Sequence, residues 1–135
     1  MLLYEPDGTP FDLRSATRVG TAVRTGHPQL RASRGIDHNY APDGEGWRRL
    51  ASLESARSRT RLDLFGEQPG VQVYTGNFLD GSVPATSGGL YRQGDGIALE
   101  PQLFPDSPNR PEWPSAQVGP GTPYRATLEW DLAPE

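Results

Sequence analysis

The fold is decided by residues 61–75, which read RLDLFGEQPGVQVYT. Apolar and polar residues alternate over the first five and again over the last five positions, and a period of two is typical of half-buried β-strands. Pro69 and Gly70, between these runs, suit the central positions of a type II turn. The stretch therefore predicts a β-hairpin, with Gln72 and Tyr74 sharing one face of its second strand.

The same alternation returns at residues 124–132, where every second residue is apolar and those between are polar or charged. This pattern predicts a strand with one packed and one solvated face, so we expect Trp130 to lie in the core. A shorter apolar run at residues 96–100 ends at Glu100. Prolines then recur every three or four residues up to Pro114, which excludes regular helix there.

The composition favours many short strands joined by turns. Among 135 residues there are 16 glycines and 14 prolines, which interrupt long helices. Residues 1–46 are broken so often that only brief strands fit between the breaks. Combined with the alternating runs, this predicts an all-β fold, an antiparallel β-sandwich with Gly/Pro-rich loops. Because hydrophobic residues make up only 34% of so short a chain, we expect it to be marginally stable alone.

Charge and residue usage exclude several classes of function. The formal net charge is −4, whereas a nucleic-acid footprint needs a basic domain. The chain has no cysteine, and the spacing of His27 and His38 is not that of a zinc site, so we expect no metal. No apolar run approaches the ~20 residues of a membrane helix, and the first residues do not read as a signal peptide. We expect a cytoplasmic protein that binds neither nucleic acid nor membrane.

Polar side chains concentrate in residues 35–40, in residues 72–78 and around Glu100. At these points the chain resembles the aldose 1-epimerases, also called galactose mutarotases. The resemblance is carried by four blocks in the family's order: GTPFDLR at 8–14, GIDHNY at 35–40, QPGVQVYTGNFLDG at 68–81 and LEPQLFPDSPN at 99–109. It covers nearly the whole chain but only the C-terminal part of the family's domain. It implies an incomplete sandwich of the galactose mutarotase (supersandwich) type, with residues 1–135 forming a single partial domain.

The resemblance also implies a reaction, the interconversion of the α and β anomers of an aldohexose such as glucose or galactose, without a cofactor. Ring opening needs a base for the O1 proton and an acid for the ring oxygen. In the family a glutamate is the base, and its motif position here is Glu100. By the same resemblance Asp37 and Gln72 bind the sugar. Pro101 departs from the threonine common in the family at that position.

The family's general acid is a histidine in the N-terminal half, and its motif is absent from these residues. A complementary N-terminal chain or a homodimer is therefore a candidate partner. The alternatives are a non-catalytic carbohydrate-binding or regulatory module and a truncated, inactive fragment. Taken alone, Glu100, Asp37 and Gln72 would be ordinary surface residues, and His38 is expected to be structural, satisfied by a neighbouring hydrogen bond.

Overall fold

The computed structural model describes residues 5–134, which form eight β-strands, two short α-helices and one 3₁₀ turn. The helices are α1 (Val19–Ala22) and α2 (Pro28–Ser33), and the 3₁₀ turn is η1 (Ser107–Asn109). The strands are β1 (Asp37–Tyr40), β2 (Arg48–Ser55), β3 (Thr60–Gly66), β4 (Gly70–Tyr74), β5 (Asp80–Pro84), β6 (Leu90–Arg92), β7 (Ala98–Gln102) and β8 (Leu128–Pro134). Neither α-helix in this part of the chain has the length or apolar character needed to cross a bilayer.

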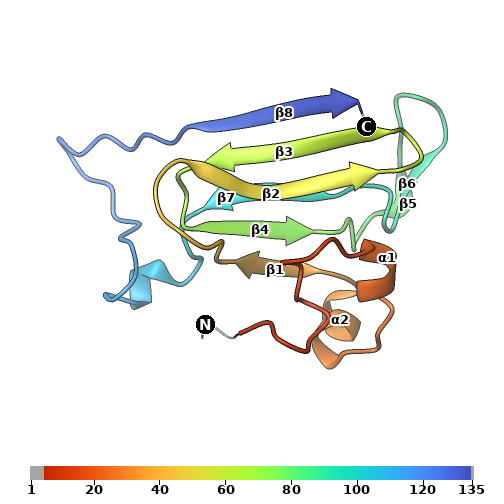
Figure 1. Cartoon of the computed structure of the whole chain (residues 1–135), viewed down its shortest axis with the longest axis horizontal. Coiled ribbons are helices and arrows are strands. Elements are labelled where there is room, and N and C mark those ends of the chain that lie inside the picture. Colours follow the sequence, from red (N-terminus) through yellow and green to blue (C-terminus); the bar gives the residue numbers. More distant parts are fainter. Residues whose placement is uncertain (1–4, 135) are drawn as a thin grey trace. The chain divides into compact units, whose positions relative to one another are not determined.

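The strands form three sheets, with the orders β1-β4-β7, β2-β3-β8 and β5-β6. Figure 1 shows β2, β3 and β8 running side by side. β3 pairs antiparallel with both neighbours, so that Leu62 lies opposite Leu53 of β2 and opposite Leu132 of β8. The pairing of β2 shifts register between Arg49 and Ala51, which marks a β-bulge. The fold is thus β-rich and largely antiparallel, as the sequence predicts.

The predicted hairpin over residues 61–75 is wrong. β3 and β4 lie where the alternation places strands, but they belong to different sheets. β3 instead forms its hairpin with β2, through a turn in which Arg59 has a φ of 51°. Gly70 does not adopt the positive φ of a type II turn. It is needed for close packing, since a Cβ there would lie 2.7 Å from Oδ1 of Asn39. Alternation identifies a strand without specifying its partner.

The chain divides into two compact units, each built from two separate segments. One unit contains the residues up to His38 together with Val73–Ala98, and the other contains Asn39–Gln72 and the residues from Leu99 onward. The buried hydrophobic side chains are Ala22, Leu30 and Ile36 in the first unit, and Leu50, Leu64, Val71 and Phe104 in the second. Each unit therefore has a small core, in keeping with the low apolar content.

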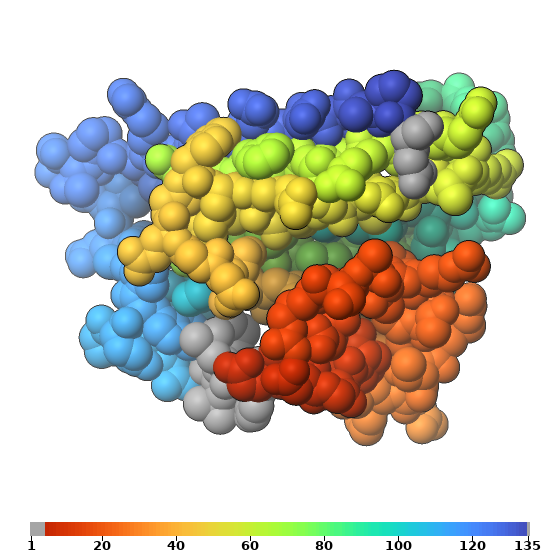
Figure 2. All heavy atoms as spheres, in the orientation of Figure 1, coloured from red at the N-terminus to blue at the C-terminus, as the bar shows by residue number. Residues whose placement is uncertain are grey.

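β8 differs from its prediction in where it begins and in how it packs. The strand starts at Leu128, four residues after the alternation does. Leu128, Trp130 and Leu132 are 46%, 44% and 66% exposed, so the expectation that Trp130 lies in the core is wrong for this chain. Figure 2 shows β8, in dark blue, as an outer row beside the yellow-green atoms of β3. The face of β8 that the alternation assigns to the core is therefore partly exposed to solvent.

The first 46 residues contain two short helices where the sequence predicts only brief strands. α2 begins at Pro28, whose fixed φ suits the first helical position. The preceding His27 accepts the N–H of Gln29 on its Nδ1 at 3.3 Å and so caps the helix. Arg34 ends the helix in the left-handed conformation, with a φ of 60°. A histidine N-cap and an arginine in the left-handed conformation at the C-terminal end are uncommon signals of helix ends. This is why the sequence does not predict the helix.

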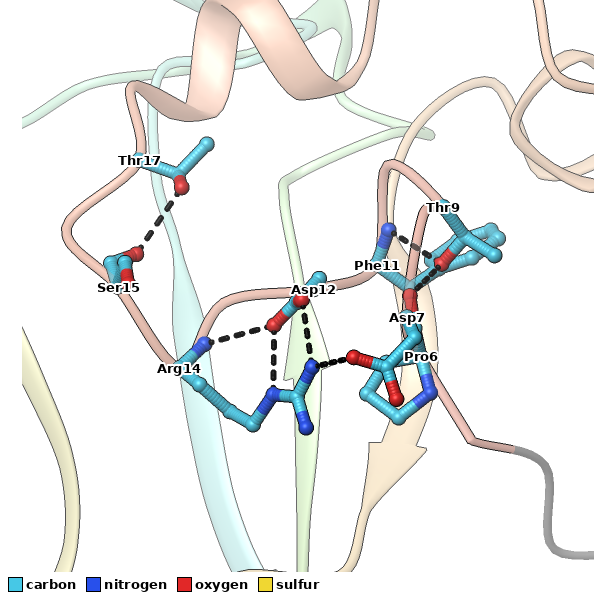
Figure 3. Close-up of polar contacts among 8 residues, drawn as sticks. All are labelled: Pro6, Asp7, Thr9, Phe11, Asp12, Arg14, Ser15 and Thr17. Atoms are coloured by element: carbon cyan, nitrogen blue, oxygen red, sulfur yellow. Dashed lines mark hydrogen bonds and ion pairs between the residues drawn. The ribbon is translucent and has the colours of Figure 1, made fainter.

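The loop before α1 is held by short-range polar contacts (Figure 3). The hydroxyl of Thr9 accepts the N–H of Phe11 at 3.2 Å. The guanidinium of Arg14 donates to both carboxylate oxygens of Asp12, at 2.9 and 2.7 Å, and also to the carboxylate of Asp7. Hydrogen bonding from Arg14 lowers the pKa of Asp12 below its ordinary value. These contacts fix the loop that presents the ring of Phe11.

Candidate functional site

The three residues expected to act on a sugar lie on strands of one sheet. Asp37 is the exposed first residue of β1, Gln72 is the partly exposed middle residue of β4, and Glu100 is the exposed middle residue of β7. These strands are hydrogen-bonded neighbours in the order β1-β4-β7. Gln72 and Glu100 belong to one compact unit, and Asp37 belongs to the other. The structure therefore places Gln72 and Glu100, which belong to the same unit, on adjacent strands, both with access to solvent.

The backbone just before Asp37 is held by a buried polar cluster, which we call the Ile36 clamp (Ile36, Thr75 and Asn77). The hydroxyl of Thr75 accepts the N–H of Ile36 at 3.0 Å, and the N–H of Thr75 donates to the carbonyl of Ile36 at 3.1 Å. Asn77 donates to the same carbonyl from Nδ2 at 2.9 Å and accepts the Thr75 hydroxyl on Oδ1 at 2.6 Å. All three residues are at least 94% buried, so these bonds are shielded from competing water.

Gly35 allows this clamp to close. Its φ is +152°, and a Cβ at this position would lie 2.6 Å from Oγ1 of Thr75 and 2.8 Å from Cγ of Asn77. Real side chains do not tolerate such distances, so the site requires glycine for its space as well as its backbone conformation. Together, Gly35 and the Ile36 clamp determine where β1 begins, and hence where the backbone of Asp37 lies.

His38 also holds the backbone of Asp37. Its Nδ1 accepts the N–H of Asp37 at 3.0 Å, so its proton resides on Nε2, which donates to Oε1 of Gln29 at 3.1 Å. The ring of Phe11 lies 4.3 Å from that of His38 and 5.0 Å from that of His27. Burial lowers the pKa of His38, against the opposing charge of Asp37. His38 thus makes the hydrogen bonds expected of a structural histidine.

A second set of buried polar groups surrounds the start of β4. Nε2 of Gln102 donates to Oδ1 of Asn39 at 3.2 Å, beside Gly70. Burial raises the pKa of Tyr40 to about 12. Within residues 5–134, the Tyr40 hydroxyl and Nδ2 of Asn39 are buried without a hydrogen-bond partner. The sequence offers no signal for these groups beyond their presence in the polar block at 35–40.

The site residues predicted from the sequence differ in how firmly their neighbours hold them. Asp37 is flanked by the clamp and by His38, whereas Glu100 stands between Leu99 and Pro101, which has no N–H to donate. Both histidines of the chain make structural contacts, His27 as a helix cap and His38 beside Asp37. Among the described residues, no group of three or more His, Asp or Glu is arranged to hold a metal ion. Within their own unit, Gln72 and Glu100 can offer an amide and an exposed carboxylate to a polar ligand.

Comparison with known proteins identifies relatives over almost the whole chain. The family described as aldose 1-epimerase matches residues 3–130. Galactose mutarotase of Mus musculus is 38% identical over 122 residues, which cover 90% of this chain and 34% of the relative. Aldose 1-epimerase of Escherichia coli strain K12 is 35% identical over 132 residues, covering 95% of this chain and 38% of the relative. This chain thus spans little more than a third of the length of the curated relatives it matches.

The fold agrees with that of a solved relative. The crystal structure of galactose 1-epimerase from Lactobacillus acidophilus NCFM superposes with a TM-score of 0.66 at 23% identity, covering 97% of this chain and 37% of that one. At that identity the likeness concerns the fold alone, and it is consistent with the all-β, sandwich-like architecture expected from the sequence. The extent of the family match, over residues that include Asp37, Gln72 and Glu100, leads to one conclusion: the chain belongs to the aldose 1-epimerase family.

Proposed function

We propose that this chain contributes to the interconversion of α and β anomers of aldohexoses, with Glu100 as general base and Asp37 and Gln72 as sugar-binding residues. The observation that carries the proposal is the family match over residues 3–130, which contain all three. The relatives are named galactose mutarotase and aldose 1-epimerase, which supports glucose or galactose as the substrate. The location of Gln72 and Glu100 on adjacent strands, both with access to solvent, supports the proposal.

The chemistry assigns each residue a task. The Glu100 carboxylate removes the proton from the anomeric O1 hydroxyl, the O1 electron pair forms the carbonyl at C1, and the bond between C1 and the ring oxygen O5 breaks. O5 takes a proton from a general acid, which gives the open-chain aldehyde. Rotation about the C1–C2 bond and reversal of both proton transfers close the ring with the other configuration. Asp37 accepts hydrogen bonds from sugar hydroxyls, and Gln72 both donates and accepts them.

The acid in this scheme comes from outside the 135 residues. His27 and His38 are already engaged in capping α2 and in holding Asp37. We place the chain as a single partial domain, the C-terminal segment of the family's sandwich, completed by an N-terminal chain that carries the acid. A homodimer fits less well, because a second copy brings only the same two histidines.

The proposal is tested with a chimera in which this chain replaces the matching 132 residues of E. coli aldose 1-epimerase. Polarimetry of fresh α-D-glucose then measures mutarotation above the spontaneous rate. Glu100→Gln should lower kcat by about 10²–10⁴, the usual contribution of a general base. Glu67→Gln, which removes an exposed glutamate in a loop, is the matched control. Equal activity of the chimera with Glu100 and with Gln at this position would remove Glu100 from the base role.

A second candidate is a non-catalytic carbohydrate-binding module. It is favoured by the structural engagement of both histidines, because the chain then contains the sugar-binding candidates Asp37 and Gln72 but no histidine left to act as the general acid. Calorimetry of the chain alone with galactose and with glucose distinguishes the two. Saturable binding that Gln72→Ala weakens, together with an inactive chimera, would favour the module over the enzyme.

A further inference from the structure

β8 is an outer strand of its sheet with an unpaired edge. Within residues 5–134 it pairs only with β3, and the sheet ends there. Leu128, Trp130 and Leu132 share one face of β8, in register with Gly66, Leu64 and Leu62 of β3. Leu64 is fully buried, but its neighbour Trp130 is 44% exposed. The apolar face of this sheet therefore extends onto β8, its outer strand among the described residues, and is exposed there.

The opposite edge of the same sheet is protected, and β8 is not. β2 carries a β-bulge next to Arg49, and the side chain of Arg48 donates to backbone carbonyls that include those of Gly46 and Gln68. Bulges and basic side chains are the usual devices that stop an edge from pairing with another strand. β8 has no bulge in its seven-residue pairing with β3 and no basic residue, and its one proline, Pro134, stands at the last position of the strand. It is the edge of this sheet that is open to a further strand.

Charge on β8 restricts what that strand can be. The polar side of β8 presents Glu129 and Asp131. Asp131 lies opposite Asp63 of β3 in the register, and Asp63 is itself satisfied by Arg61, with Nε to Oδ2 at 2.7 Å. A strand added at the free edge thus meets two carboxylates, and like charges directly opposite one another destabilise a pair of strands. The fitting partner carries Lys or Arg on that face.

A second copy of this chain does not meet that requirement. Antiparallel pairing of two β8 strands centred on Asp131 puts Asp131 opposite itself. Centring on Trp130 puts Glu129 opposite Asp131 twice. The register with the greatest overlap, centred on Asp131, therefore opposes two acids, and no register pairs an acid with a base, because β8 has no basic residue.

We propose that the free edge of β8 docks a β-strand from the part of the aldose 1-epimerase chain that lies outside these 135 residues. That strand places apolar side chains beside Leu128, Trp130 and Leu132, and basic side chains opposite Glu129 and Asp131. The relatives hold almost two-thirds of their length outside the matched region, which is ample to supply it. The inference deepens the proposal of a complementary N-terminal chain by naming the surface that receives it.

The test is co-expression of this chain, carrying an affinity tag, with the part of E. coli aldose 1-epimerase outside the 132 matched residues. The expected result is a 1:1 complex by light scattering, with slowed hydrogen exchange at the β8 amides that face away from β3. The double variant Trp130→Asp/Leu132→Asp should weaken the complex by at least ~30-fold, as expected for loss of a buried aromatic anchor. Glu129→Lys/Asp131→Lys should weaken it too, most strongly at low salt.

Val118→Asp is the matched control, because Val118 is 61% exposed in the same unit but lies outside the sheet. Thermal melts establish that each variant is folded. Failure to form a complex, a complex that tolerates the double variant, or a homodimer through β8 would each overturn the proposal. Mass and hydrogen exchange involve no sugar, so the outcome is independent of whether Glu100 acts as a base.

Discussion

Substitution of Gly35 by alanine tests whether the Ile36 clamp holds the chain before Asp37. An alanine must adopt the φ of +152° seen at Gly35, and its Cβ would lie 2.6 Å from Oγ1 of Thr75. A strained backbone of this kind costs ~1–3 kcal/mol. Moving Thr75 or Asn77 away breaks at least one buried hydrogen bond, which costs another ~1–3 kcal/mol. The free energy of unfolding should therefore fall by roughly 2–6 kcal/mol, a large part of the ~5–15 kcal/mol typical of a domain.

Gly26→Ala separates the two costs, because Gly26 has a φ of +78° and a Cβ added there would meet no heavy atom within 4 Å. It should lose only the backbone strain, about 1–2 kcal/mol. Urea denaturation followed by circular dichroism measures both variants. In the Asn77→Ala background the cost of Gly35→Ala should shrink toward that of Gly26→Ala, because the clashing side chain has gone. Equal losses for Gly35→Ala and Gly26→Ala in the wild-type background would refute the clamp.

Three further predictions concern single side chains. Burial lowers the pKa of His38, so its contribution to stability is complete above the unfolded value of about 6.5 and is lost as pH falls through the folded value. In urea melts from pH 7 to 5, the free energy of unfolding should fall less steeply for His38→Gln than for the wild type, and parallel curves would contradict this. Tyr40→Phe removes a buried hydroxyl with no partner in the described chain, so thermal melts should show stability unchanged or raised by up to ~1 kcal/mol, whereas a clear loss would reveal a bond to that hydroxyl. Leu64→Ala should cost ~3–5 kcal/mol in denaturant titrations because Leu64 is fully buried in the central strand, and a loss below ~1 kcal/mol would show that the core collapses around it.

Strand positions could be predicted from the sequence, but strand partners could not. The alternation over residues 61–75 correctly indicates β3 and β4, because a period of two reports which side chains share a face. It contains no information on pairing, and β3 joins β2 and β8 rather than β4. The β3–β8 pair connects residues more than sixty positions apart, a distance that no local pattern spans.

The same limit applies to the candidate site. The polar blocks around Asp37, Gln72 and Glu100 are visible as concentrations of polar residues, and these strands are neighbours in one sheet. The role of Gly35 is not visible in the sequence, because it depends on Thr75 and Asn77 some forty residues away. The exposure of Trp130 is also not visible in the sequence, since alternation shows which side chains share a face of a strand but not whether another layer covers that face.

The pairing of β8 with β3 has a consequence for synthesis on the ribosome. β2 and β3 can form their hairpin early, because only a four-residue turn separates them. The second partner of β3 is translated more than sixty residues later, so one flank of Leu64 stays open until β8 emerges. During that interval the nascent hairpin presents an apolar strand with an unpaired edge, the type of segment that chaperones protect and that aggregates when they do not. Slowed translation between residues 66 and 128 should therefore lower the soluble yield more than slowed translation before β2.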